Sequence, residues 1–457
     1  MRSRHRNKLT IALVSDFFCP NTGGVETHIY YLGECLLRRG HKVIVLTHAY
    51  GQRKGIRYFT NGLKVYYLPF FQIGNGSGIL SSVVGSLYWL RRIYTDEAVD
   101  IVHGHSAFSA LAHEAMFHAW CLGIKTVFTD HSLFGFADAS AILTSKLLLQ
   151  YSLINIDRFI CVSYTSKENT VLRAKLNPDK VYVIPNAIEK HLFTPDPVSY
   201  AKKPLTVIVM SRLVYRKGAD LLVDVIPEIC ARHPTVQFII AGDGPKRVPI
   251  EEMREKHKLH SRCEMVGMLP HNLVRDLLIR GQIFLNTSLT EAFCTTIVEA
   301  ASCGLHIVST AVGGVPEVLS SEFITLAKPD AGSLTEALLE AIDKHESGSL
   351  MTPLQRHERM SPMYRWPSVA TRTEVVYYSV MDDELMSLKT RLSNYFNCGR
   401  SFGMMWTWFT LVVMILIHIL DFFDNLILHT SSKPSTSKRP QPQKLIMNGQ
   451  KKLNGRS

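Results

Sequence analysis

The chain of 457 residues lacks the short motifs of several common protein classes. Its nine cysteines are scattered and nowhere spaced as Cys-x-x-Cys, which argues against a disulfide framework and for a reducing compartment around the globular part. No Gly-x-Gly-x-x-Gly sequence occurs, so neither half carries a dinucleotide fingerprint. No Asp-x-Asp pair offers a cation site, and we expect no metal and no other cofactor.

Positive charge is in excess but lacks the pattern of a nucleic-acid-binding protein. The formal net charge is +12, and no basic stripe is interleaved with aromatic residues. The clearest basic clusters are the C-terminal tail and Arg2, Arg4, Arg6 and Lys8. We expect no nucleic-acid partner, because an anionic membrane surface or a phosphate-bearing ligand explains the charge more simply.

The N-terminal segment also lacks the features of a cleaved signal. Basic residues precede the apolar run 9–14, but Asp16 interrupts the apolar pattern and no small-residue cleavage site follows. We interpret this run as the first strand of a domain.

Continuous apolar strands alternate with helical patterns up to about residue 350. A polar, proline-rich break at residues 195–204 divides the pattern into two halves. Strands are predicted at residues 9–15, 42–47, 99–103, 125–129, 158–162, 181–184, 205–210, 237–241, 265–267, 282–286 and 306–309. Such runs indicate parallel sheets covered on both faces. The predicted fold class is α/β, with two tandem doubly wound Rossmann-like domains whose ligands bind beyond the carboxyl ends of the strands.

The C-terminal part departs from this alternation. Residues 368–388 are predicted as one long helix. Residues 403–420 are apolar apart from His418 and would extend about 27 Å as a helix, close to the thickness of the bilayer core. A buried or in-plane helix is the alternative, but a single membrane span is favoured because the run is apolar on all faces. The basic tail from Lys433 is predicted to be disordered, and charge leaves the orientation of the span open.

Two glutamates, Glu291 and Glu299, are separated by seven residues between a predicted strand and a predicted helix. A strand end, a loop and a new helix N-terminus form an anion site, and the carboxylates could hold hydroxyl-rich parts of the same ligand. The alternative is structural. Thr296 and Glu299 fit a capping box, and Glu291 would then be a solvated loop charge.

Two cations follow the first predicted strand of the second half. Arg212 offers a bidentate fork and Lys217 a point charge, both suited to a diphosphate, although a solvated loop would show the same residues. The pair Gly23 and Gly24 stands between a strand and a helix, where backbone amides can approach a phosphate or simply form a tight turn. Gly242 begins a turn after the next strand that could line a nucleotide base.

Histidines gather at strand ends of the first half. His131 follows a predicted strand, where it can donate a hydrogen bond to a sugar hydroxyl or to developing charge. His103 and His105 end another strand, and His113 and His118 lie beyond. Metal binding is disfavoured, since the last two do not share a helical face and no cysteine or carboxylate completes a zinc set.

Together these motifs resemble those of GT-B-fold retaining glycosyltransferases of family 4. The marks of that family are the glycine pair, the Arg and Lys of the Ser-Arg-Leu loop and the Glu-x7-Glu motif, which occur in this order across residues 9–380. Residues 129–138, 161–173 and 285–294, and the C-terminal span, resemble more closely the catalytic subunits of phosphatidylinositol N-acetylglucosaminyltransferases.

The resemblance implies transfer of N-acetylglucosamine from UDP-GlcNAc to phosphatidylinositol with retention, the first step of GPI-anchor biosynthesis. It implies a single-pass protein of the endoplasmic reticulum membrane with cytosolic catalytic domains and other subunits as partners. The alternatives are a different sugar nucleotide or lipid, as in a mannosyltransferase, or a non-catalytic assembly role. The implied parts are an acceptor-side domain (1–195), a nucleotide-sugar domain (204–365), a return helix and linker (366–400), a transmembrane helix (403–420) and the tail (421–457).

The resemblance also implies roles for single residues. His131 and Glu291 would act on the transferred sugar, His131 facing it across the cleft between the domains. Glu299 would bind the donor ribose, and Arg212 and Lys217 would neutralise the diphosphate. The remaining donor-binding residues would be Gly24, Gly242, Thr295 and Thr296, with no metal ion.

Overall fold

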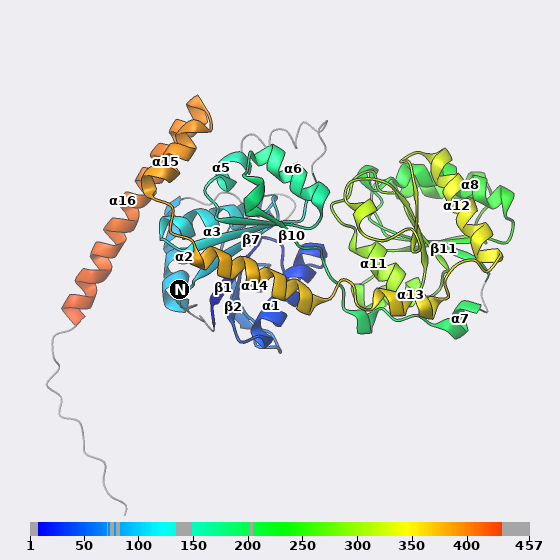
Figure 1. Cartoon of the computed structure of the whole chain (residues 1–457), viewed down its shortest axis with the longest axis horizontal. Helices are drawn as coiled ribbons and strands as arrows, with labels where there is room; N and C mark the ends of the chain where they lie inside the picture. Colours follow the sequence, from blue (N-terminus) through cyan, green and yellow to red (C-terminus); the bar gives the residue numbers. More distant parts are fainter. Residues whose placement is uncertain are drawn as a thin grey trace, which may run out of the picture. The chain divides into compact units, whose positions relative to one another are not determined.

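The computed structural model describes residues 8–70, 72–73, 77–78, 83–133, 149–201 and 204–431 (Figure 1). The chain divides into two compact units, Met1–Thr410 and Leu411–Ser457. Three sequence predictions lie outside the described residues: the basic cluster at Arg2, Arg4 and Arg6, the end of the stretch 129–138, and the tail from Lys433.

The first sheet has eight strands in the order β10-β9-β8-β7-β1-β2-β4-β3. Its strands are β1 (Thr10–Val14), β2 (Lys42–His48), β3 (Gly55–Tyr58), β4 (Lys64–Leu68), β7 (Ile101–His105), β8 (Lys125–Asp130), β9 (Arg158–Cys161) and β10 (Val181–Val183). All neighbours are parallel except β3, which pairs antiparallel with β4 at the edge. The helices of this part are α1 (Gly24–Arg38), α2 (Val83–Glu97), α3 (Ala110–Cys121), α5 (Gln150–Leu153) and α6 (Tyr164–Ala174). A separate hairpin joins β5 (Gln72–Ile73) and β6 (Ser77–Gly78).

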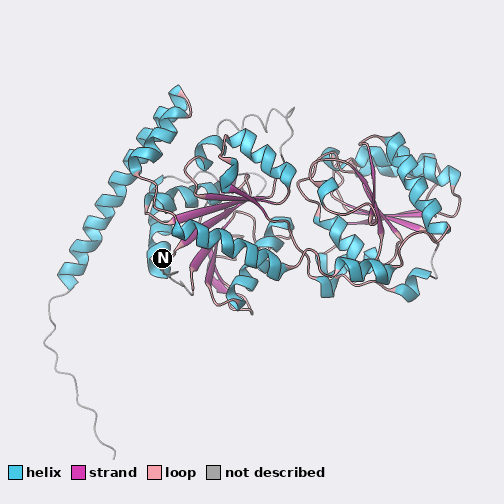
Figure 2. Cartoon of the chain, in the orientation of Figure 1, coloured by secondary structure: helices cyan, strands magenta, loops and turns pink. Residues whose placement is uncertain are grey.

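The second sheet has six parallel strands in the order β13-β12-β11-β14-β15-β16. Its strands are β11 (Thr206–Met210), β12 (Gln237–Ala241), β13 (Cys263–Gly267), β14 (Ile283–Asn286), β15 (His306–Thr310) and β16 (Ile324–Ala327). Its helices are α8 (Ala219–Arg232), α9 (Arg247–Lys256), α10 (Val274–Leu278), α11 (Thr295–Ser302), α12 (Ala331–Glu346) and α13 (Pro353–Met360). The short α7 (Pro197–Ala201) lies in the polar break before this sheet. Figure 2 shows the strands of each sheet enclosed by helices.

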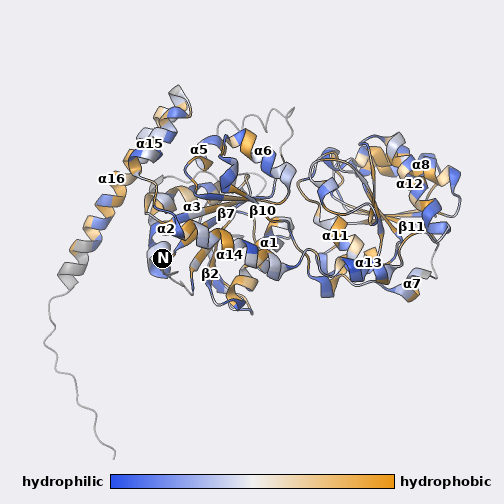
Figure 3. Cartoon of the chain, viewed as in Figure 1, coloured by the Kyte–Doolittle hydropathy of each residue, from blue (hydrophilic) through white to orange (hydrophobic). Residues whose placement is uncertain are grey.

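Burial explains why these runs form strands. The central strands β1 and β11 are apolar and buried along nearly their whole length, as expected for parallel strands covered on both faces (Figure 3). The predicted α/β fold with two doubly wound sheets is confirmed. The strands β3, β4 and β16 and the hairpin strands β5 and β6 were not among the predicted ones. The strand β3 is exposed at every residue, and β4 and β16 are only partly buried.

One predicted helix is two helices. The segment 368–388 contains α14 (Trp366–Asp382), a break and the start of α15 (Leu388–Asn397). Asp383 has an extended backbone (ψ 147°), and the Ser387 side chain accepts a hydrogen bond from the Thr390 N–H. A serine N-cap starts a new helix, so the long-helix prediction is wrong at this point.

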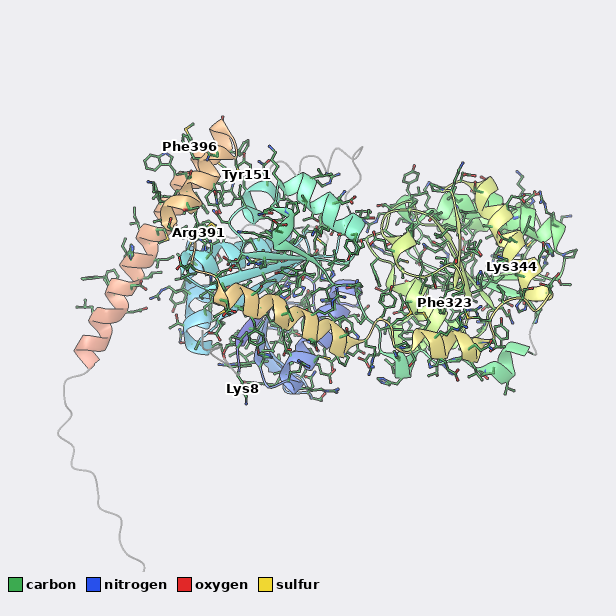
Figure 4. All side chains as sticks on the ribbon, viewed as in Figure 1. Lys8, Tyr151, Phe323, Lys344, Arg391 and Phe396 are labelled. Atoms are coloured by element: carbon green, nitrogen blue, oxygen red, sulfur yellow. The ribbon has the colours of Figure 1, made fainter. Side chains whose placement is uncertain are left out.

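The helix α14 returns the chain to the first sheet. Its buried residues Val369, Val376 and Tyr377 join the apolar cluster around β1 and β2. The next helix, α15, packs on α3, where the Arg391 guanidinium lies 4.7 Å from the centre of the Trp120 ring. Arg391, labelled in Figure 4, also donates to the carbonyl of Asn155, just after α5, at 3.0 Å. The first domain is therefore completed by residues from the far end of the chain.

The last helix, α16, runs from Arg400 to Ser431. Its segment Ser401–Asp424 has a mean hydropathy of 1.9 and is long and apolar enough to cross a membrane. The helix continues beyond the predicted span 403–420 into the segment predicted as the tail (421–457) and ends at Ser431. Residues 426–428 are still apolar, and the first helix-breaking residue is Pro434, which explains why the helix extends further.

Candidate functional site

The two glutamates lie on either side of the start of α11. The N-cap is Cys294, with a left-handed backbone (φ 65°) and no side-chain cap among the described residues. Thr296 is the second residue inside the helix, so the capping-box interpretation is wrong. Glu299 is 9% exposed, and its carboxylate is 3.5 Å from Nε2 of His271. The Ile297 N–H donates to the Cys294 carbonyl at 3.2 Å, so the amides of Thr295 and Thr296 are the ones left for another acceptor, as in an anion site.

Glu291 is held by a cation and a hydroxyl. Its Oε1 forms an ion pair with Nζ of Lys217 and accepts a hydrogen bond from Ser288 Oγ at 2.8 Å. Because β11 pairs directly with β14, the loops that follow these strands meet at one sheet edge. The structure thus pairs Glu291, which was predicted to contact the transferred sugar, with Lys217, which was predicted to neutralise the diphosphate.

A glycine permits this meeting of loops. Gly218 has φ 65°, and a Cβ there would lie 1.8 Å from the Thr287 carbonyl oxygen. The Thr287 hydroxyl in turn donates to the Lys217 carbonyl at 2.9 Å. Only a glycine allows the two backbones to approach this closely at a positive φ.

Arg212 follows β11, and neighbouring charges of both signs act on its pKa. Burial and the nearby Arg216 lower its pKa, whereas Glu291 and Glu26 favour its charged form. Glu26 is in the first turn of α1, and burial raises its pKa. The Glu26 carboxylate, in the first turn of α1, thus affects the pKa of Arg212, which follows β11 in the second sheet. Sequence analysis did not single out Glu26, although an acidic residue after a glycine pair could have been noticed.

The predicted glycines have different surroundings. A Cβ at Gly24 would meet nothing within 4 Å, so the start of α1 is open. A Cβ at Gly242 would lie 1.8 Å from the Ser211 carbonyl oxygen, at φ 134°. Gly242 is therefore needed for the close approach of two backbone segments beside Arg212, whatever it contributes to a nucleotide.

His131 lies directly after β8 in a group of three histidines. The group comprises His28 from α1, His105 at the end of β7 and His131, with donor atoms within 4.8 Å of one another. Burial lowers the pKa of His28 to about 4 and the pKa values of His105 and His131 well below the usual range, so all three are neutral.

Sequence analysis missed His28, because a residue on α1 is distant in sequence from the two strand ends. Of the other predicted histidines, His103 lies against His105, with 4.1 Å between ring centres, whereas His113 and His118 have partners outside this group. The His113 ring bonds to the Ala107 carbonyl at 3.0 Å, and His118 lies 3.3 Å from the Ser86 hydroxyl.

Asp130 anchors the loop that carries His131. Its carboxylate accepts hydrogen bonds from the Ser132 N–H and from the Thr170 hydroxyl, both at 2.9 Å. Burial raises the pKa of Asp130 to about 6, with these hydrogen bonds opposing the rise.

Helices and loops of both α/β halves line one small pocket. Its lining includes Thr27, Tyr31, His271, Thr295, Glu299 and Trp366. Trp366 also meets the His28 ring, with 5.4 Å between ring centres. The start of α11 and the middle of α1 therefore face the same space.

Comparison with known proteins identifies the two halves. The family PIGA (GPI anchor biosynthesis) matches residues 48–138, and the family of glycosyl transferases group 1 matches residues 194–355. The chain is 52% identical over 413 residues to a phosphatidylinositol N-acetylglucosaminyltransferase subunit of Arabidopsis thaliana, with 90% of each chain covered. It is 55% identical over 399 residues to the human protein of the same name, covering 87% of this chain and 81% of that one.

Solved structures show the fold. A glycosyltransferase from Rickettsia africae superposes with a TM-score of 0.66 at 17% identity, over 83% of this chain and 100% of that one. Anabaena HepE in complex with UDP-glucose gives a TM-score of 0.63 at 16% identity, over 81% and 100%. The predicted GT-B architecture and the predicted family are both confirmed. The chain belongs to the PIG-A family of phosphatidylinositol N-acetylglucosaminyltransferase subunits.

Proposed function

We propose that this chain transfers N-acetylglucosamine from UDP-GlcNAc to phosphatidylinositol with retention, as the first step of GPI-anchor biosynthesis. The names of its relatives support the sugar and the lipid. The observation that carries the proposal is the ion pair between Lys217, in the loop after β11, and Glu291, in the loop before α11, next to the first amides of that helix, which have no side-chain cap among the described residues.

The donor diphosphate would lie at the start of α11. Arg212 and Lys217 supply positive charge there, and the helix dipole and first-turn amides add to it. Thr295 and Thr296 occupy that first turn and would donate to phosphate oxygens through their amides and hydroxyls. These groups can balance the charge of a departing nucleoside diphosphate, so the proposed transfer involves no metal ion and no other cofactor.

The carboxylates of Glu299 and Glu291 would bind two different uncharged parts of the donor, the ribose and the transferred sugar. Glu299 lies one turn into α11 and lines the pocket, which suits a pair of hydrogen bonds to ribose hydroxyls. Glu291 is oriented by Lys217 and Ser288 and would accept from hydroxyls of the transferred sugar. His131 and Gly24, from the first sheet, would border the sugar and the phosphates.

The setting would be a membrane. The segment Ser401–Asp424 suits a single span, which would bring the site close to a lipid acceptor. The relatives are named as subunits, which supports partner subunits for this chain. We place the protein in the endoplasmic reticulum membrane with its catalytic domains on the cytosolic side.

A radiolabel assay tests this function. Membranes from cells that lack the endogenous protein receive the full chain, labelled UDP-GlcNAc and phosphatidylinositol, and lipid product is counted. Glu299→Gln should lower product by at least about 100-fold, because an amide cannot accept both ribose hydrogen bonds. Glu340→Gln, on the exposed face of α12, is the matched control and should match wild type. Full activity of Glu299→Gln, or labelling from GDP-mannose instead, would contradict the proposal.

A further inference from the structure

The His105 and His131 rings meet edge to edge. His105 Nδ1 and His131 Nε2 are 3.3 Å apart, the ring centres are 5.6 Å apart and the ring planes differ by 21°. For a given distance between the two nitrogens, the ring centres are furthest apart when both nitrogens lie between them. Centres this far apart therefore require both nitrogens to lie on the line that joins them. One nitrogen points straight at the other, which is the geometry of a linear N–H···N hydrogen bond.

This geometry favours a shared proton over a metal ion. Zinc binds imidazole nitrogen along its lone pair at about 2.0–2.1 Å. Here both lone pairs point along the line between the two nitrogens, which is too short to hold an ion at that distance from each, and an ion beside the line would lie off both lone-pair directions. The third histidine, His28, has its Nδ1 3.0 Å from the Asn186 side-chain oxygen, which orients its ring.

The position of the proton follows from the other nitrogen of His105. Nε2 of His105 is buried and has no hydrogen-bond partner among the described residues. A buried N–H without an acceptor is rare, whereas an unused acceptor lone pair is tolerated more often. Nε2 is therefore the bare nitrogen, and the proton is on Nδ1. His105 donates it to His131 Nε2, so a neutral His131 must carry its own proton on Nδ1.

The His105 ring is held in place from the side. The His103 ring lies against it, with 4.1 Å between centres. His103 is fixed in turn by the Tyr377 hydroxyl at 2.7 Å and by the Thr129 hydroxyl at 2.6 Å. The return helix α14, which carries Tyr377, thus supports the residue behind His131.

We propose that His105 is a positioning residue that locks His131 in the Nδ1–H tautomer, so that His131 meets the transferred sugar as a neutral hydrogen-bond donor. This inference rests on the proposed function, in which His131 faces that sugar. Without the donor at His105, the His131 ring can exchange tautomers and rotate. Its N–H then points at the sugar for only part of the time.

Two substitutions of similar size separate this role from simple packing. In His105→Asn the amide nitrogen takes the place of Nδ1 and can still donate, whereas in His105→Gln the amide lies near the Nε2 position. We expect the Asn variant to keep most of the activity and the Gln variant to lose about 10- to 100-fold in kcat/KM. In a His131→Ala background, His105→Gln should cost nothing further. Equal loss in both variants, or an undiminished loss in the His131→Ala background, would overturn the inference.

A second measurement does not depend on turnover. The full chain, labelled with 15N-histidine in detergent micelles, should show His131 with its proton on Nδ1. The His105→Gln substitution should shift that signal and His105→Asn should preserve it. A His131 proton on Nε2 in the wild type refutes the tautomer assignment. If instead the tautomer is as expected but His131→Ala is fully active, the proposed sugar contact fails and the assignment stands.

Discussion

Replacing Asp130 by Asn should stabilise the protein at neutral pH and much less in acid. Asp130 is 1% exposed, and burial raises its pKa from 3.8 to about 6. Asn has nearly the same shape, can accept the Ser132 N–H and can pair with the Thr170 hydroxyl, which is free to rotate. The substitution therefore removes a buried charge while keeping its hydrogen bonds.

The size of the effect follows from proton linkage. Below about pH 3.8 both folded and unfolded chains carry a neutral Asp130, and burial costs nothing. Between about pH 3.8 and pH 6 the unfolded chain ionises first, so the folded state loses stability as the pH rises. Above about pH 6 the full penalty of about 3 kcal/mol applies. The same relation gives about 1.6 kcal/mol at pH 5, so the advantage of Asn should grow by about 1.4 kcal/mol up to pH 7.5.

Thermal unfolding of the full chain in detergent tests this reasoning. Wild type and Asp130→Asn are compared at about pH 5 and about pH 7.5. The Tm difference in favour of Asn should be larger at the higher pH. Asp130→Ala serves as a control, because it leaves Ser132 and Thr170 without their acceptor and should be destabilising at both pH values. A Tm difference that is constant with pH, or that shrinks as the pH rises, would refute the assignment of a raised pKa.

Two further predictions concern the loops beside α11. Lys217→Met leaves the mostly buried Glu291 carboxylate without its cation and should lower kcat/KM for UDP-GlcNAc by at least about 100-fold, while Lys344→Met on α12 should be neutral. Gly218→Ala places a Cβ 1.8 Å from a backbone carbonyl and should abolish the recovery of folded protein, whereas Gly51→Ala, also at positive φ but in open space, should cost only about 1 kcal/mol in denaturant unfolding. Normal yield of Gly218→Ala would contradict the backbone contact.

Most of the strands that sequence analysis located are buried along nearly their whole length, although β10 and β13 are only partly buried. A continuous apolar run such as β1 or β11 predicts a buried strand from the sequence alone, because no polar residue interrupts it. The exposed edge strand β3 has no such signal and depends on pairing with β4. The break between α14 and α15 depends on one serine cap, which a periodicity argument overlooks.

The start of α11 shows a different limit. The pattern from Thr296 to Glu299 fits a capping box with Thr296 as the N-cap, but the N-cap is Cys294, two residues earlier, which has a left-handed backbone. A positive φ at a residue other than glycine is imposed by the surrounding chain and leaves no mark in the sequence. The capping motif was therefore a coincidence of spacing, and the helix amides are free of side-chain caps within the described chain.

The sequence by itself determined the two α/β halves, the apolar C-terminal helix and the kinds of chemistry available: two carboxylates, two cations and a histidine at strand ends. Only the tertiary structure decided their partners. Lys217 meets Glu291 because β11 pairs with β14, and His105 meets His131 because β7 pairs with β8. Local periodicity predicts how each segment is buried. The order of strands in a sheet depends instead on contacts between residues far apart in the sequence, and that order brings side chains from distant loops together.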